Sequence, residues 1–519
     1  MRVLFIFYYL MLAVFHGLSL KPEICIMSYS TMRRSLLTKL HVRFVMPTAH
    51  KRIFSPSLQG LAGVAISMCV AASVWATQPL LMAQNEVFYL NKAIALAHER
   101  DPWLASSRYK ERAMMAQSEA SLALPDPVVS LSIANVPTDG FSFNQEPMTQ
   151  LKAGITQMLP RGNSRHIQSQ YQEALALEQP LLRMQRIAKS TVMVTALWLE
   201  AYKAKAKIIL IEENQVLLSQ LGDIAKANYA SAIGNTRQQD VISANLEVSK
   251  IKDRLIQLKA RKVVSIEQLN EWLQVDHIEQ SRHKQAIPAL SNSGFAAAIS
   301  LPTELPVLAP FTAAVLGALN GNNRQTLAKM LSVHPTIQAI DQRISASTNA
   351  IDLAKQKYNP QWGLSASYGY RDNDQLGRSR ANFLSVGISF DVPLYTSQKQ
   401  DKEVSASVYN SESIKTDKRL ALRQLISQLS ATYTLHKQLQ ERLSLYKTQI
   451  LPQTIEQSET VLNAFTNNDG NFNEVLQAQI TQLNAQLSLL DIQVEQHIVH
   501  SQLTYYMTTS ANYTMHKAL

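Results

Sequence analysis

The chain has 519 residues and a formal net charge of +11 at pH 7. Much of this charge lies in residues 1–52, which carry eight Lys or Arg side chains and a single acid, Glu23. The remainder has mixed charges without a patch of interleaved basic and aromatic residues, so composition excludes the footprint of a nucleic-acid-binding protein.

An export signal is predicted at the N-terminus. Two basic residues precede an apolar run at 58–74, and small side chains at Val74 and Ala76 occupy the positions that a leader peptidase reads. Residues 1–76 are therefore predicted to be an N-terminal leader or signal region. A transmembrane anchor is the alternative, because the apolar run is of borderline length for a spanning helix.

Both cysteines, Cys25 and Cys69, fall inside this predicted leader. The mature chain would then have no disulfide and no cysteine-based metal or redox site. Lipidation of Cys69 is an alternative that Met68 disfavours, because the residue before a lipidated cysteine is normally small.

The second half of the chain repeats the first at a constant spacing. Four punctuating residues recur 233 positions later: Pro102, Pro127, Gly154 and Pro160 as Pro335, Pro360, Gly387 and Pro393. A constant offset predicts a tandem structural repeat. The predicted units are 77–310, which includes a Pro-rich linker, and 311–519.

Each repeat contains two predicted strands, 128–134 and 149–158 in the first and 361–370 and 382–390 in the second. Apolar and small polar residues alternate along them, and Lys152 is their only charge. This pattern is typical of transmembrane β-barrels, although a soluble half-buried sheet alternates in the same way. Four strands cannot close a barrel, so several chains would have to contribute.

Two long helical hairpins are predicted, over 161–273 and 397–508. Apolar residues on the return arms step by three and four, a heptad pattern that predicts a coiled-coil seam. The predicted seam residues are Val241, Ala244, Val248, Ile251, Leu255 and Leu258, and Leu476, Ile480, Leu483, Leu487, Leu490 and Val494. The opposite faces are rich in Gln, Ser, Thr and Asn, which suits either open solvent or a water-filled lumen.

The hairpin turns, near 233–236 and 467–471, are the candidate gate. Glycines there are expected to supply positive backbone dihedrals, and nearby acids could form rings that select cations or repel one another. Helix capping is the alternative role for these acids. The candidate gate and docking residues are Gly234, Asp240, Asp469, Gly470 and Glu474.

No catalytic constellation is present in the sequence. It lacks a Gly-rich phosphate loop, a nucleophile elbow and a His-Glu-x-x-His motif, so no enzyme activity and no cofactor are predicted. His497 and His500 lie one helical turn apart, but two imidazoles without a carboxylate or thiolate make a poor metal site. No metal site is predicted.

Together, these motifs resemble the TolC-like outer-membrane efflux family over Glu86 to Met507. The resemblance rests on the repeat and on five motifs in a fixed order: LPDP at 124–127, MTQLKAGITQMLPRGN at 148–163, GNTRQQDVISA at 234–244, GISFDVPLY at 387–395 and GNFNEVLQAQ at 470–479. The wording of LPDP, of NVP at 135–137 and of the second motif, MTQL to PRGN, is most similar to the heavy-metal branch, which serves copper/silver or cobalt/zinc/cadmium pumps.

The resemblance implies a mainly α fold with a small β part. It further implies a homotrimer in the cell outer membrane, with a shared β-barrel and a long periplasmic α-barrel. Such a trimer is a passive duct that docks onto a periplasmic adaptor and an inner-membrane pump of the resistance-nodulation-division type. The alternative is a periplasmic adaptor or structural coiled-coil protein, although an adaptor would normally have one hairpin flanked by small β-domains.

Overall fold

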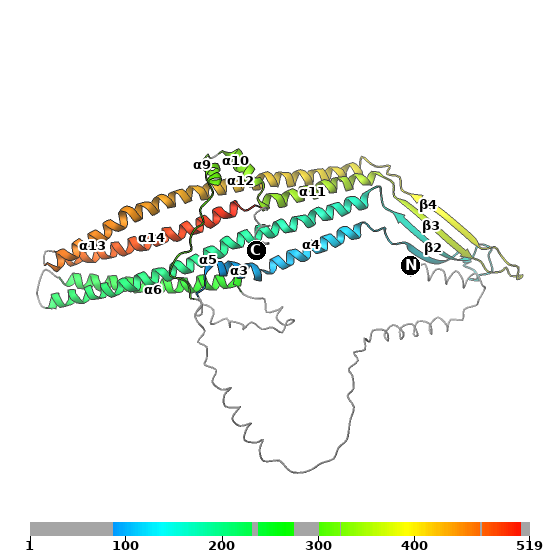
Figure 1. Cartoon of the computed structure of the whole chain (residues 1–519). Helices are drawn as coiled ribbons and strands as arrows, with labels where there is room; N and C mark the ends of the chain where they lie inside the picture. Colours follow the sequence, from blue (N-terminus) through cyan, green and yellow to red (C-terminus); the bar gives the residue numbers. More distant parts are fainter. Residues whose placement is uncertain (1–86, 231–236, 274–299, 322, 468–469, 510–519) are drawn as a thin grey trace, which may run out of the picture. The chain divides into compact units, whose positions relative to one another are not determined.

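The structure is a computed structural model that describes residues 87–230, 237–273, 300–321, 323–467 and 470–509. The predicted leader at 1–76 lies outside the described residues. Within them, long helices make up most of the chain and one small antiparallel sheet accounts for its β structure (Figure 1). The predicted mainly α fold with a small β part is confirmed.

The sheet contains four strands in the order β1-β2-β3-β4, and every neighbouring pair is antiparallel. Its strands are β1 (Val128–Ala134), β2 (Gln150–Leu159), β3 (Trp362–Tyr370) and β4 (Phe383–Phe390). Each boundary lies within one residue of the sequence prediction. Strands distant in the sequence are therefore joined through the β2–β3 pair, which holds the two halves of the chain together.

The first half of the chain leads into and out of β1 and β2. Its helices are α3 (Leu90–Arg100), α4 (Pro102–Ser121), α5 (Ser164–Ala230) and α6 (Gln238–Leu273). α4 starts where it does because the Asp101 side chain accepts a hydrogen bond from the Trp103 backbone N–H, and Pro102 suits the first helical position. α5 continues for 67 residues through Pro180.

The second half follows a similar order around β3 and β4. Its helical elements are α9 (Ala313–Asn320), α10 (Arg324–Ser332), α11 (Pro335–Lys355), η1 (Gln356–Tyr358), α12 (Gln400–Leu445), η2 (Tyr446–Ile450), α13 (Leu451–Thr466) and α14 (Phe472–Tyr506). η2 is a π-helical turn just before Pro452. Because proline has no N–H and crowds the carbonyl one turn earlier, this widened turn lets the helix continue past it.

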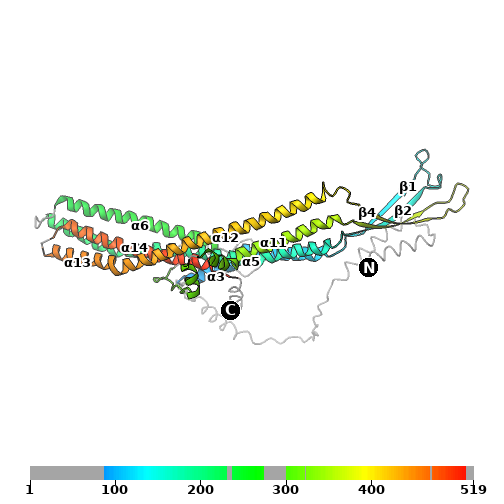
Figure 2. The same cartoon turned by 90° about the horizontal axis from the view of Figure 1, so that it is seen from above.

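The long helices pack side by side in a fixed lateral order. Near the sheet, α4 packs on α5, α5 on α11 and α11 on α12, with α4 and α12 at the two ends of the row (Figure 1). Farther from the sheet, α5 packs between α6 and α14, and α14 also packs on α12 and α13 (Figures 1 and 2). The row of helices thus follows the order of the strands to which they connect.

Most of the predicted seam residues lie in the core between the hairpins, whereas Leu490 and Val494 belong to a second apolar cluster and Val248 belongs to neither. Ala244, Ile251 and Leu255 of α6 and Leu476, Leu483 and Leu487 of α14 are buried in one cluster with apolar residues of α5. Val241, Leu258 and Ile480 pack against that cluster. Apolar burial of this kind stabilises long helices that propensity alone would not hold.

Candidate functional site

The two hairpin ends lie together at the end of the helices away from the sheet. α5 and α6 meet there, and so do α13 and α14 (Figures 1 and 2). Phe472 at the start of α14 is 2% exposed, contacts Phe465 edge-on at 6.0 Å and joins the cluster that includes α5 and α6. The tips therefore share one apolar core.

Asp240 lies inside this junction and is 3% exposed. One carboxylate oxygen accepts a hydrogen bond from the Arg237 backbone N–H at 2.8 Å, as in a capping box, so it satisfies a free donor at the start of α6. The other oxygen accepts a hydrogen bond from the Asn473 side-chain amide at 2.5 Å. Asp240 thus caps α6 and links the two hairpins.

Sequence reasoning did not single out Asn473. It lies 233 positions after Asp240, which is the offset between the duplicated motifs. That offset was the available signal, because it marks Asn473 as the equivalent position of the second hairpin.

Glu474 has a different environment from Asp240. It is exposed in the first turn of α14, where the Asn471 side chain caps the helix by accepting the Asn473 backbone N–H at 3.1 Å. A carboxylate in this position is favoured by the positive end of the helix dipole. The side chain is also free to face water or a partner at the tip.

Gly470 is required for a reason that sequence reasoning got wrong. Among the described glycines, positive φ values occur at Gly162 and Gly377, whereas the backbone dihedral predicted to be positive at Gly470 is not. A Cβ at position 470 would lie 2.7 Å from the Phe465 backbone nitrogen and 2.8 Å from its Cα. Close approach of the chain is therefore what demands glycine. Gly234 and Asp469, the other two candidates at the tips, lie outside the described residues.

The strand register gives the sheet one largely apolar face. On that face, Leu131 pairs with Ala153, and Val386 pairs with Ala366. Its apolar and aromatic members are Val129, Leu131, Ile133, Leu151, Ala153, Ile155, Leu159, Trp362, Leu364, Ala366, Tyr368, Tyr370, Leu384, Val386, Ile388 and Phe390, and the polar Gln157 lies among them. Several are largely exposed, with Leu131 at 73%, Leu384 at 73% and Val386 at 77%.

The opposite face is small and polar. Its central members, in register across the four strands, are Ser130, Ser132, Lys152, Gly154, Ser365, Ser367, Gly369, Ser385, Gly387 and Ser389. An added Cβ at Gly154 would lie 2.9 Å from the Ser130 hydroxyl. Glycine avoids a side chain that would crowd its neighbours on this face, and the serine hydroxyls can form hydrogen bonds with water.

A cluster of histidines lies between α12 and α14, away from both regions. The rings of His436 and His500 are 6.3 Å apart, and His500 stacks on Phe311 at 4.2 Å. Burial, aided by the neighbouring His436 and His497, lowers the pKa of His500 to about 4. Within the described ranges, no group of three or more His, Cys, Asp or Glu side chains could hold a metal ion.

None of the helices in the described part of the chain combines the length and the hydropathy needed to cross a bilayer.

Comparison with known sequences finds one family model that matches part of the chain. The model of the family described as "Outer membrane efflux protein" matches residues 326–507, which run from α10 to the end of α14. This stretch of the chain is therefore similar to the outer membrane efflux proteins. No curated protein sequence matches it significantly.

Solved structures of outer-membrane channels share the fold over most of the chain. The outer-membrane channel OprN aligns with a TM-score of 0.63 at 14% identity, covering 80% of this chain and 89% of that one. VceC from Vibrio cholerae aligns with a TM-score of 0.64 at 14% identity, covering 81% of this chain and 96% of VceC. The CmeC channel of Campylobacter jejuni aligns with a TM-score of 0.62 at 10% identity, covering 92% of this chain and 98% of CmeC. The chain therefore has the fold of outer-membrane efflux channels.

Proposed function

We propose that this protein is the outer-membrane channel of a tripartite efflux system, and that it acts as a passive trimeric duct from the periplasm to the exterior. The observation that carries the proposal is the exposed, largely apolar face of the sheet. The family match and the shared fold support the same function.

The apolar face is not covered by any other segment within the described part of the chain. Leu131, Leu384 and Val386 are each more than 70% exposed, and a contiguous apolar surface of this kind marks an interface with protein or lipid. The sheet has one small polar face opposite, which is how a barrel strand divides lipid from a water-filled lumen. We infer that the apolar face contacts the hydrocarbon of the outer membrane.

β1 and β4 are the edges of this sheet. In lipid an unpaired edge is prohibitively costly, so the sheet must close by pairing β1 of one copy with β4 of the next. Two copies would give about eight strands, whose interior side chains fill the barrel, whereas three copies give about twelve and leave room for a lumen. A homotrimer is the proposed assembly.

The helices extend this closed ring into the periplasm. The row α4–α5–α11–α12 continues the strand order, so closing the sheet places α12 of one copy beside α4 of the next. The proposed duct ends at the hairpin tips, where Asp240, Gly470 and Glu474 lie and where Gly234 and Asp469 are predicted. We propose that these tips form the gate and dock onto a periplasmic adaptor and a pump of the resistance-nodulation-division type.

The proposed duct works by shape and gating, without a catalytic step or a cofactor. Heavy-metal cations are the proposed cargo, on the wording of the LPDP and PRGN motifs. The alternative, a periplasmic adaptor, fits less well because an adaptor lies in the aqueous periplasm, where an exposed apolar sheet face would be in contact with water.

Membrane fractionation tests the proposal. The chain expressed with its own N-terminus should sediment with the outer membrane, resist urea extraction, and migrate unheated as a trimer. A urea-extractable monomer, or one in the inner membrane, would refute the barrel and favour the adaptor. Deleting the gene should then raise sensitivity to copper, silver, cobalt, zinc or cadmium salts if the cargo is a metal.

A further inference from the structure

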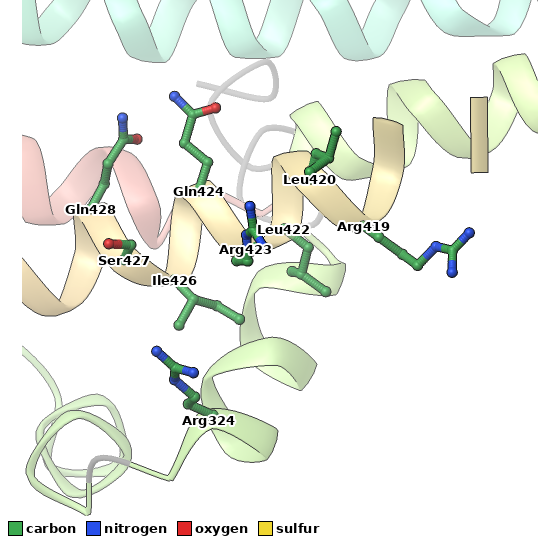
Figure 3. Close-up of a pocket in the computed structure, with 9 residues that line it drawn as sticks. All are labelled: Arg324, Arg419, Leu420, Leu422, Arg423, Gln424, Ile426, Ser427 and Gln428. Atoms are coloured by element: carbon green, nitrogen blue, oxygen red, sulfur yellow. The ribbon is translucent and has the colours of Figure 1, made fainter. Parts of the chain in front are cut away.

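A hollow of about 690 Å³ lies between α10 and α12 and carries three arginines (Figure 3). Arg324 comes from α10, whereas Arg419 and Arg423 come from α12. Three apolar and three uncharged polar side chains line the rest of the hollow, and among the apolar ones Leu420 is 50% exposed. It is an open, cationic and partly apolar surface on the helix at the end of the row.

None of the three arginines has a carboxylate partner within the described part of the chain. Arg419 donates a hydrogen bond to the Thr416 hydroxyl at 3.0 Å, and, after Lys415, it helps to lower the pKa of the Glu412 carboxyl. Two nearby bases of α12 are paired: Lys415 with Glu412 at 2.8 Å and Lys418 with Asp341 at 2.6 Å. The unpaired arginines therefore have the charge to receive an anionic partner.

Ion pairs between neighbouring helices relate the positions of these arginines to that of α4. The position compared is the distance from the sheet along the helix axes, called the level below. Three pairs cross the row in succession, from α12 to α11, from α11 to α5 and from α5 to the start of α4. They are Lys418–Asp341 at 2.6 Å, Arg343–Glu178 at 2.5 Å and Arg186–Asp101 at 2.7 Å. Because each pair holds its two helices at one level, distances from the sheet can be counted along the helices.

The count places Arg423 level with Asp101. Arg423 follows Lys418 by five residues, so it lies ~7.5 Å farther from the sheet at ~1.5 Å per residue. α11 runs toward the sheet, so Arg343 lies two residues, or ~3 Å, closer to the sheet than Asp341, the partner of Lys418. α5 runs away from the sheet, so Arg186 lies eight residues, or ~12 Å, farther from the sheet than Glu178, the partner of Arg343. Asp101, bound to Arg186, is therefore within a few ångströms of the level of Arg423.

In the proposed trimer, the copies are related by rotation about an axis that runs along the helices, so equivalent residues of all copies lie at the same distance from the sheet. If α12 of one copy lies beside α4 of the next, Arg423 faces the α3–α4 junction of that neighbour, around residues 99–102. Asp101 there is already paired with its own Arg186. Glu99 is exposed at the end of α3 and has no ion pair among the described residues.

We propose that Arg423, assisted by Arg419, binds Glu99 of a neighbouring copy, so that three equivalent ion pairs latch the ring of helices at the level of the α3–α4 junction. This inference rests on the proposed trimer and adds the residues that hold it. The half-exposed Leu420 would be covered by the same contact.

Charge reversal tests the latch. Arg423→Glu and Glu99→Arg should each lower the unheated trimer fraction about tenfold in detergent at 0.15 M salt, because like charges then face each other. The double variant should restore it to near the wild-type level. Lys437→Glu is the matched control, since it reverses an exposed base on the same helix ~21 Å farther from the sheet and should have no effect.

A second test does not depend on stability. In a chain with Cys25 and Cys69 replaced by serine, Glu99→Cys combined with Arg423→Cys should form an interchain disulfide on mild oxidation, and Glu99→Cys combined with Lys437→Cys should not. A wild-type trimer without rescue and without cross-linking would overturn the latch and leave the channel standing. If the reversals spare the trimer but abolish co-purification of the adaptor, the arginines bind an acidic partner protein and the latch is wrong. A wild-type monomer would overturn both.

Discussion

Asp240 accepts a hydrogen bond of 2.5 Å from the side-chain amide of Asn473, and these residues are 233 positions apart. The same spacing separates the duplicated Pro and Gly positions of the sequence. The bond therefore joins equivalent points of the two predicted repeats, at the helix starts that follow the hairpin turns. A carboxylate that caps its own helix and holds the other hairpin makes the tips a single unit.

Asp240→Ala should loosen both tips. It removes the acceptor for the Arg237 N–H and for the Asn473 amide, which leaves two partly buried donors without partners and costs about 1–3 kcal/mol of local stability. Hydrogen exchange of the amides in 238–245 and 472–478 should accelerate together. Asn473→Ala should accelerate them less, since the α6 cap survives. Unchanged exchange with a larger resting conductance would instead give Asp240 a purely electrostatic gating role.

Gly470→Ala should destabilise the second turn. Its Cβ would lie within 3 Å of Phe465 backbone atoms, which cannot move without shifting the end of α13. We expect a loss of about 1–3 kcal/mol, read as faster proteolysis at the tip and a lower Tm. Gly317→Ala in α9 is the matched control, because nothing lies within 4 Å of its Cβ, and the added helix propensity should be neutral or stabilising. Equal behaviour of the two variants would contradict the spatial explanation.

Stability should fall on acidification because of the buried histidines. Burial lowers the pKa of His436 and His497, and lowers that of His500 to about 4, so the folded protein keeps these imidazoles neutral. The unfolded chain takes up their protons near pH 6.5, so the folded state loses stability as pH falls from about 7 toward 4.

Thermal unfolding between pH 7.5 and 4.5 measures this effect. His500→Gln, which cannot ionise, should flatten the dependence of Tm on pH, whereas His166→Gln at an exposed position should leave it as in the wild type. A Tm profile that His500→Gln does not change would show that other groups control the acid response.

The two faces of β4 should tolerate charge differently. Val386→Arg places a cation on the apolar face, at a cost of about 2–4 kcal/mol in the middle of a bilayer, and should strongly reduce the amount of protein in the outer membrane. Ser385→Arg, one residue earlier on the small polar face with Lys152, should assemble. Assembly is measured by quantifying the unheated, urea-resistant species. The reverse order of tolerance would place lipid on the other face.

Sequence periodicity predicted the strands and the seams well, because alternation and heptads are local records of which side chains are buried. The two faces of each strand could therefore be predicted from the sequence. The register between β2 and β3 could not, because it depends on how segments from the two halves of the chain pack together. Asp240 could be recognised as a helix-start acid, yet its contact with Asn473 needed the two hairpins placed together. The sequence suggested a positive backbone dihedral at Gly470, because the crowding by Phe465 that requires glycine there is visible only in three dimensions.

Native mass spectrometry of the detergent-extracted, unheated protein tests the central claim most directly. A dominant species with the mass of three mature chains, dissociating cooperatively on heating, is the result expected for a shared barrel closed between β1 and β4. A monomer that keeps its folded circular dichroism spectrum in detergent would contradict it, since one four-stranded sheet with two free edges cannot stand alone in a membrane.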